Sequence, residues 1–228
     1  MPRYALYYAP RPDEEIARFA AKWLGRDPES GRVLDQPAVA GLSRERLAEI
    51  TADPRRYGFH GTLKPPFELL PSVALAEMLA RAAEFAANRP AVALRGLALK
   101  SIDGFLALVP QATADIDALA ADCVREFDRY RAPPNPAELA RRRAAGLTAR
   151  QDELLGRWGY PYVMEEFRFH LTLTGRLAAE ERTLVQTALA PLVASFAVAQ
   201  TAISDLCIFV QDDREQPFRV LARLPFRR

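Results

Sequence analysis

Histidine, lysine and cysteine are scarce in this 228-residue chain, and their scarcity limits the kinds of functional site that it can form. The two cysteines, Cys123 and Cys207, are far apart and show no Cys-x-x-Cys spacing, so we predict buried reduced thiols rather than a redox pair. The three lysines leave almost all the positive charge to arginine, and the formal net charge is only +2. Binding to long nucleic acid needs many phosphate contacts, so this weak excess argues against it.

Several patterns of common protein classes are also missing. No hydrophobic run reaches the length of a membrane span, and the apolar part of the N-terminus is too short for a signal peptide, so we expect a cytoplasmic protein with no membrane partner. No Walker-type loop or Gly-x-Gly-x-x-Gly pattern supports nucleotide hydrolysis or dinucleotide binding. The histidines and carboxylates lack metal-ligand spacing, so neither a metal nor a cofactor is expected.

Both histidines of the chain lie in matching five-residue motifs. The first is Phe59-His60-Gly61-Thr62-Leu63, and the second is Phe169-His170-Leu171-Thr172-Leu173. If each motif is a strand, side chains alternate between its faces, so each histidine shares a face with the threonine two residues on. We therefore predict that the two polar faces meet in one cleft.

The elements around the motifs also occur twice in the same order. Each motif strand precedes a helix and then a pair of strands, which predicts an α+β fold of duplicated βαββ-type halves around a central cleft. The halves span about 57–131 and 166–225 of a single bilobal domain covering 1–228, with strand and helices of 1–56 packed on them. Residues 132–162 do not fit the repeat and are predicted to be a helical insertion.

Paired histidines and threonines suit chemistry at a phosphate. Imidazole has a pKa near 6.5, so one of His60 and His170 can act as base while the other acts as acid. The hydroxyls of Thr62 and Thr172 can donate hydrogen bonds to phosphate oxygens without adding charge. We predict the histidines as catalytic residues and the threonines as phosphate-binding residues.

Further candidates have two interpretations each. Lys64 alternates onto the His60 face and either neutralises phosphate or only marks the end of the strand before Pro65. Tyr7, Tyr57 and Tyr162 either stack on a base or ribose or form the edge of the core. Arg142, in the basic run of the insertion, either lies on a solvated helix face or clamps phosphate from a lid.

The paired His-x-Thr motifs in two strand-helix-strand halves resemble the 2H phosphoesterase superfamily. Within it, the Arg3 to Tyr8 strand, the block from Tyr57 to Pro66 and the stretch after Arg131 are similar to a bacterial family associated with phosphonate-degradation genes. The resemblance implies a metal-independent hydrolase or transferase that acts on cyclic phosphates or phosphodiesters, with His60, Thr62, His170 and Thr172 as motif residues. Of these we expect a hydrolase that opens a cyclic phosphate or phosphodiester of a small sugar or nucleotide. The alternative is a non-catalytic module that binds an RNA terminus or a phosphorylated metabolite. Its partner would be a small phosphate ester or a short RNA end, and we expect a monomer.

Overall fold

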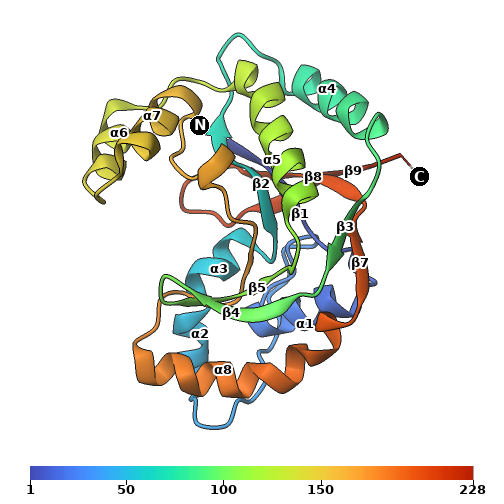
Figure 1. Cartoon of the computed structure of the whole chain (residues 1–228), viewed down its shortest axis with the longest axis vertical. Coiled ribbons are helices and arrows are strands. Elements are labelled where there is room, and N and C mark those ends of the chain that lie inside the picture. Colours follow the sequence, from blue (N-terminus) through green and yellow to red (C-terminus); the bar gives the residue numbers. More distant parts are fainter. Residues whose placement is uncertain (228) are drawn as a thin grey trace.

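A central antiparallel sheet organises the structure, a computed structural model that describes residues 1–227 (Figure 1). Its seven strands run in the order β4-β5-β6-β2-β1-β8-β9, while β3 and β7 form a separate antiparallel pair. The strands are β1 (Arg3–Tyr8), β2 (Gly61–Glu68), β3 (Val92–Arg95), β4 (Ala98–Ile102), β5 (Phe105–Val109), β6 (Leu171–Thr172), β7 (Gln200–Ile203), β8 (Asp205–Gln211) and β9 (Arg219–Pro225). The predicted α+β class is confirmed.

Helices pack on this sheet because each has one apolar side. In α1, for example, Ile16, Ala20 and Trp23 recur at helical spacing and are buried, and Gly25 ends the helix with a left-handed φ of 74°. Helix α5 packs on β2, α4 on β9, and α8 on β4 and β5. The α-helices are α1 (Glu15–Leu24), α2 (Arg44–Ile50), α3 (Ala52–Tyr57), α4 (Leu75–Ala87), α5 (Ala114–Phe127), α6 (Pro136–Arg143), α7 (Ala149–Trp158) and α8 (Ala179–Val193).

The order of strand, helix, strand and hairpin occurs twice along the chain. The first series is β2, α4, β3 and the β4-β5 hairpin, and the second is β6, α8, β7 and the β8-β9 hairpin. The hairpins cross over in the sheet, because β5 lies beside β6 of the second series, and β8 lies beside β1, which pairs with β2 of the first. Each series therefore completes the sheet of the other.

The strands differ from the sequence expectation most clearly at three places. The first motif strand was expected over 57–64, but β2 begins at Gly61 and continues through Pro65 and Pro66 to Glu68. A single strand was expected over 92–100, but Gly96 adopts a φ of 65° and separates β3 from β4, which belong to different sheets. The second motif was expected to be a strand over 167–174, but only Leu171–Thr172 has strand pairing, and the segment before it is a 3-10 turn at Met164–Glu166. The short strand is enough to set the position of the second motif.

The stretch 132–162, which was expected to be a helical insertion, contains α6 and α7, and these two helices project from one corner of the molecule (Figure 1). The Asn135 side chain accepts a hydrogen bond from the amide of Ala137 at the start of α6, with Pro136 as first helical residue. Thr148 and Gln151 form a reciprocal capping box at the start of α7. Both helix starts thus follow from capping residues in the sequence.

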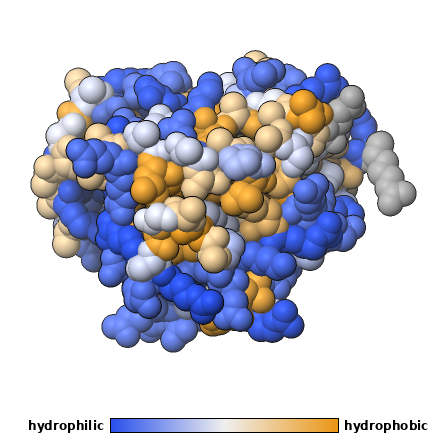
Figure 2. Space-filling model, turned by 90° about the horizontal axis from the view of Figure 1, so that it is seen from below, coloured by the Kyte–Doolittle hydropathy of each residue, from blue (hydrophilic) through white to orange (hydrophobic). Residues whose placement is uncertain are grey.

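Figure 2 shows the face seen from below, where apolar side chains gather amid a polar surround. Helix α8 runs along this side of the molecule in Figure 1 and carries two partly exposed leucines, Leu184 and Leu192. Within residues 1–227, none of the helices is both long and apolar enough to cross a bilayer. Cys123 and Cys207 are buried free thiols, as predicted.

Candidate active site

The two histidine motifs lie on adjacent strands of the sheet. Strand β2 pairs antiparallel with β6 through Gly61 and Leu171, the central residues of the two motifs. Counting outward from this pair in opposite directions sets His60 beside Thr172 and Thr62 beside His170. The antiparallel pairing therefore brings all four motif residues to one place, although the motifs are far apart in sequence.

A close approach between the motifs explains why the first has glycine at its centre. A Cβ atom built on Gly61 would lie 2.2 Å from Cζ of Phe169, whose ring is buried. Phe169 precedes His170 and points to the other face of the strand, toward the core. The second motif thus packs directly against the backbone of the first, which fixes the two histidines relative to each other.

His60 has a fixed orientation. Its Nδ1 lies 2.8 Å from the carbonyl oxygen of Gly58, which can only accept, so Nδ1 carries the proton and donates it. Nε2 of the neutral ring is then a proton acceptor, and the Thr62 hydroxyl lies 3.3 Å away. The imidazole also stacks on the ring of Tyr7, with 3.8 Å between ring centroids.

His170 is held in the same manner. Its Nδ1 donates to the carbonyl oxygen of Arg168 at 2.7 Å, again two residues before the histidine. The ring of Phe105 lies beside it, at 5.3 Å between centroids. In both motifs the backbone carbonyl therefore selects the same tautomer and leaves Nε2 as the proton-accepting nitrogen.

Desolvation lowers the pKa of both histidines. Burial by the surrounding side chains is the main cause at His60, where it outweighs the hydrogen bond to Gly58, and the second histidine lowers the value further; the resulting pKa is about 4. For His170, burial again lowers the pKa, opposed by the Arg168 carbonyl and the charge of Asp103. Both imidazoles are therefore neutral at neutral pH.

The four motif residues line one open cavity of about 500 Å³, which we call the histidine cleft. Aromatic and basic side chains from several elements complete its walls. They are Tyr7, Tyr57, Phe105 and Tyr160, together with Arg3, Arg141, Arg142 and Arg176. Hydroxyl groups and ring nitrogens thus share a cavity with arginines, an environment suited to an anionic ligand.

Lys64 does not line the histidine cleft. The pairing of β1 with β2 shifts between Tyr7, opposite Thr62, and Leu6, opposite Lys64, so β2 has one extra residue there. This bulge turns Lys64 to the core side, where its amine lies 3.4 Å from Oδ1 of Asp128. Burial lowers the pKa of Lys64 to about 8, and Asp128 partly offsets that effect. The expected alternation onto the His60 face fails because of the bulge.

The other secondary candidates have different positions. Tyr57 lines the cleft and stacks on Phe218, with 5.2 Å between centroids, and Tyr7 lies under His60. Arg142 reaches the cleft from α6, so the insertion contributes directly to this cavity. Tyr162 is 46% exposed, is not among the residues that line the cleft, and packs edge-on against Tyr160.

Several residues of the cleft were not singled out as functional from the sequence, and Arg3 and Tyr160 are two of them. Arg3 opens β1 and reaches the cleft because residues 3, 5 and 7 share one face of this strand. Tyr160 follows α7 and receives the guanidinium of Arg142 over its ring, 4.7 Å from the centroid. The position of Arg3 four residues before Tyr7 on one strand was the available clue.

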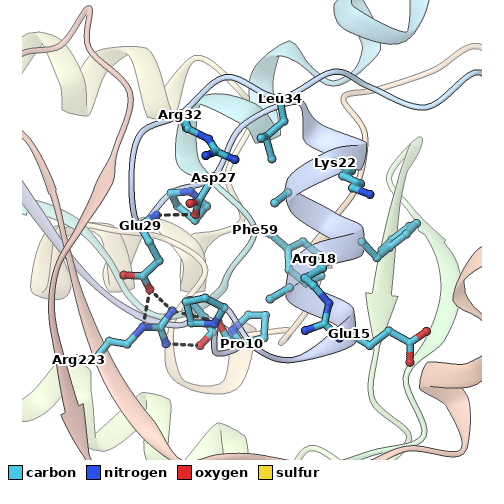
Figure 3. Close-up of a pocket in the computed structure, with 16 residues that line it drawn as sticks. Pro10, Glu15, Arg18, Lys22, Asp27, Glu29, Arg32, Leu34, Phe59 and Arg223 are labelled. Atoms are coloured by element: carbon cyan, nitrogen blue, oxygen red, sulfur yellow. Dashed lines mark hydrogen bonds and ion pairs between the residues drawn. The ribbon is translucent and has the colours of Figure 1, made fainter.

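A second cavity, of about 490 Å³, lies on the other side of the first motif (Figure 3). Phe59 lines it, whereas the next residue, His60, lines the histidine cleft. An ion pair between Arg223 and Glu29 closes one edge. This second cavity is lined by neither histidine. Within the described part of the chain, no three His, Cys, Asp or Glu side chains cluster as metal ligands.

The fold and site define an α+β protein whose antiparallel sheet carries paired His-x-Thr motifs in one cleft. A family model described as a protein of unknown function, DUF1045, matches residues 62–219, and the chain belongs to this family. It is 41% identical over 231 residues to a protein named ribose 1,5-bisphosphate phosphokinase PhnN from Janthinobacterium sp. (strain Marseille). A protein of the same name from Laribacter hongkongensis (strain HLHK9) is 34% identical over 226 residues. These alignments cover 99% and 96% of this chain.

The chain spans about half the length of these curated relatives, 51% and 50%. Their PhnN names agree with the expected link to phosphonate-related genes. Their names also describe kinases, which transfer a phosphoryl group rather than hydrolyse an ester. The expectation of a hydrolase that opens a cyclic phosphate or phosphodiester is therefore wrong by this comparison.

Proposed function

We propose that the histidine cleft binds a phosphorylated ribose and takes part in phosphoryl transfer to it. The observation that carries this proposal is the pair of imidazoles whose Nδ1 atoms are both engaged by backbone carbonyls, so that both Nε2 atoms are available in one cavity with two threonines. The names of the relatives supply the class of ligand, a ribose phosphate, and the class of reaction.

The proposed roles follow from the protonation of the two rings. A neutral His60, with its pKa lowered to about 4, accepts the proton of an attacking ribose hydroxyl at Nε2. The hydroxyl oxygen forms the new bond to phosphorus as the bond to the donor, a nucleoside triphosphate, breaks. His170 donates a hydrogen bond when protonated near the bound phosphate, and Thr62 and Thr172 donate to non-bridging oxygens.

We further infer that the chain has the duplicated fold of the 2H type, as a single bilobal domain with halves at about 57–131 and 166–225. Support comes from the repeated order of strand, helix, strand and hairpin, and from the equivalent hydrogen bonds of the two histidines. The two motifs would then be the two copies of one half-site. This inference concerns the fold and leaves the reaction to the experiment below.

The test is to mix the chain with ribose 5-phosphate or ribose 1,5-bisphosphate, with and without ATP, and to follow phosphorus resonances by NMR. Binding of the sugar phosphates is measured separately by calorimetry. We expect binding to both, transfer from ATP to at least one, and a loss of roughly 100-fold or more in rate for His60→Gln and for His170→Gln. Arg46→Gln, at an exposed ion pair with Glu181 outside the cleft, is the control.

Two outcomes would contradict the proposal. The first is the absence of calorimetric binding to either ribose phosphate. The second is a rate of transfer in the histidine variants equal to that of the Arg46→Gln control. Circular dichroism of each variant shows whether a loss of activity is accompanied by a loss of fold.

A further inference from the structure

One end of the histidine cleft is rich in arginine. Arg3 from β1 and Arg141 and Arg142 from α6 line the cavity there, and we call this group the arginine end. Arg3 lies four residues before Tyr7 on the same strand, so their Cα atoms are about 13 Å apart at ~3.3 Å per residue. The arginine end therefore lies along β1 from Tyr7, on which the His60 ring stacks, and both belong to the same cavity.

The charge of Arg3 is not balanced by an acid. Its guanidinium donates to the side-chain oxygen of Gln211, a neutral group, and lies over the ring of Phe218 at 5.3 Å from the centroid. Among residues 1–227, no carboxylate is recorded within ion-pair distance of it. Burial and the neighbouring cation Arg214 lower the pKa of Arg3, and they outweigh the opposing effects of Tyr57, Tyr7 and the charge of Glu138.

Arg142 also has a hydrogen-bond donor that no protein group in the described residues uses. One terminal nitrogen binds Oε1 of Glu138 at 2.8 Å, and the guanidinium packs on Tyr160. Its Nε is buried and has no hydrogen-bond partner in the described structure. A buried donor without a partner is costly, so the side chain is built to receive an acceptor that protein groups do not supply.

The local charges leave a surplus on the positive side. Arg3, Arg141, Arg142 and Arg214 contribute four positive charges around this end of the cleft. Glu138 and Glu68 contribute two negative charges; Glu138 pairs with Arg142 and lies 4.0 Å from both Arg141 and Arg214, and Glu68 pairs with Arg214. The nearby Arg131 is balanced by Asp128. The remaining two positive charges match one phosphate group, which carries close to two negative charges at neutral pH.

We propose that the arginine end is a second phosphate subsite, so that the cleft takes a sugar carrying two phosphate groups. This inference rests on the proposed function, which places the first phosphate at the histidines and threonines. The second phosphate accepts hydrogen bonds from Arg3 and from Nε of Arg142, and the sugar lies between, beside Tyr7 and Tyr57. The insertion that carries Arg142 thereby selects bisphosphates over monophosphates.

Calorimetry with two probes tests the subsite. Ribose 5-phosphate and ribose 1,5-bisphosphate are titrated into the wild-type chain and into Arg3→Gln, Arg142→Gln and Arg46→Gln. We expect the wild type to bind the bisphosphate at least about 10-fold more tightly, because a charge-assisted hydrogen bond contributes enough for a factor of roughly 10. Arg3→Gln and Arg142→Gln should each move this ratio of dissociation constants toward one, while Arg46→Gln keeps the wild-type ratio.

The outcomes separate this inference from the function on which it rests. If the chain binds both probes equally well, or if the ratio is the same in all three variants, the second subsite is refuted and the binding of ribose phosphate stands. If neither probe binds, the proposed function fails and the subsite fails with it. Arg142 lies on the insertion and Arg3 in the sheet, so misfolding of one variant leaves the other to decide.

Discussion

The lowered pKa of His60 should make the stability of the protein depend on pH. Because His60 stays neutral down to a pKa of about 4, the folded chain binds no proton there between pH 6.5 and 4, whereas an unfolded chain does. The unfolded state then binds more protons, so the free energy of unfolding should fall as the pH decreases through this window. His60→Gln should reduce this loss of stability, as measured by urea unfolding at pH 7 and pH 5.

The same two residues are the only histidines, so their ring signals in an NMR titration can be assigned with one variant each. We expect the His60 signals to titrate near pH 4, and a bound phosphate to raise the pKa of both rings by its negative charge. Titration of His60 near pH 6.5 in the free protein would show that its ring is fully hydrated and not desolvated by the cleft.

Lys64 and Asp128 lead to a second prediction at this scale. The side chain of Lys64 is 2% exposed, and Asp128 is its acidic partner and also binds Arg131 at 2.7 Å. Asp128→Asn leaves a buried cation without an acid, so we expect a loss of about 3 kcal/mol in the free energy of unfolding. Lys64→Met keeps the volume and removes the charge, so its effect should be within about 1 kcal/mol.

Urea unfolding of both variants measures these changes, and calorimetry with ribose 5-phosphate adds a second readout. Lys64→Met should bind this ligand like the wild type, since the lysine lies outside the cleft. A Lys64→Met variant that folds normally but loses the ligand would assign the lysine to phosphate binding after all.

Residues whose position depends on local alternation could be predicted from the sequence, and those that depend on a bulge or a distant partner could not. The shared faces of His60 with Thr62 and of His170 with Thr172 follow from period-two alternation. The bulge that removes Lys64 from that face appears only when β1 pairs with β2. The role of Arg3 depends on the insertion more than 130 residues away folding over the same cavity.

At the scale of the element, the contact between the motif strands depends on Gly61. Any side chain at this position meets the ring of Phe169, so Gly61→Ala should force the strands apart and lower the free energy of unfolding by about 1–3 kcal/mol. The same change should weaken ligand binding, because the histidines move with their strands. Thermal unfolding and calorimetry with ribose 5-phosphate measure the two effects.

Gly156 provides a matched control for that substitution. It lies within α7, is exposed, and has open space where a Cβ would be. Gly156→Ala should therefore raise the free energy of unfolding by about 0.5–1 kcal/mol through helix propensity. Equal effects of the two alanine substitutions would contradict the close packing between Gly61 and Phe169.

The capping residues of the insertion illustrate which elements a sequence specifies. Asn135-Pro136 and the Thr148 to Gln151 box act within a few residues, so the starts of α6 and α7 are readable locally. The separation of β3 from β4 at Gly96 depends on the partner of each strand, and β3 pairs with β7 more than 100 residues later. Tertiary pairing, not local preference, decides such boundaries.

At the scale of the whole molecule, the crossed hairpins predict that neither part of the chain folds alone. A fragment of residues 1–131 lacks β6, which separates β5 from β2, and also lacks β8, the partner of β1. A fragment of residues 132–228 contains β6 without either neighbour. We expect each fragment to show no cooperative thermal transition by circular dichroism, and a mixture of the two to regain one.

Cooperative melting of either fragment by itself would contradict this dependence between the two parts. The intact chain is the reference for the transition temperature. A mixture that melts cooperatively and binds ribose 5-phosphate would show that the cleft forms whenever the sheet is complete.

The part of β2 that continues past its pairing with β6 has a consequence for aggregation at high protein concentration. β6 pairs with β2 at Gly61, and within residues 1–227 only β1 pairs with β2 from there to the bridge at Leu69, so the opposite edge of this stretch has no strand partner. Pro65 and Pro66 occupy the middle of this free edge and have no amide hydrogen to offer. A strand from another molecule therefore cannot form a regular ladder of backbone hydrogen bonds with this edge. By this argument the two prolines protect the open edge of the sheet beside the cleft from aggregation.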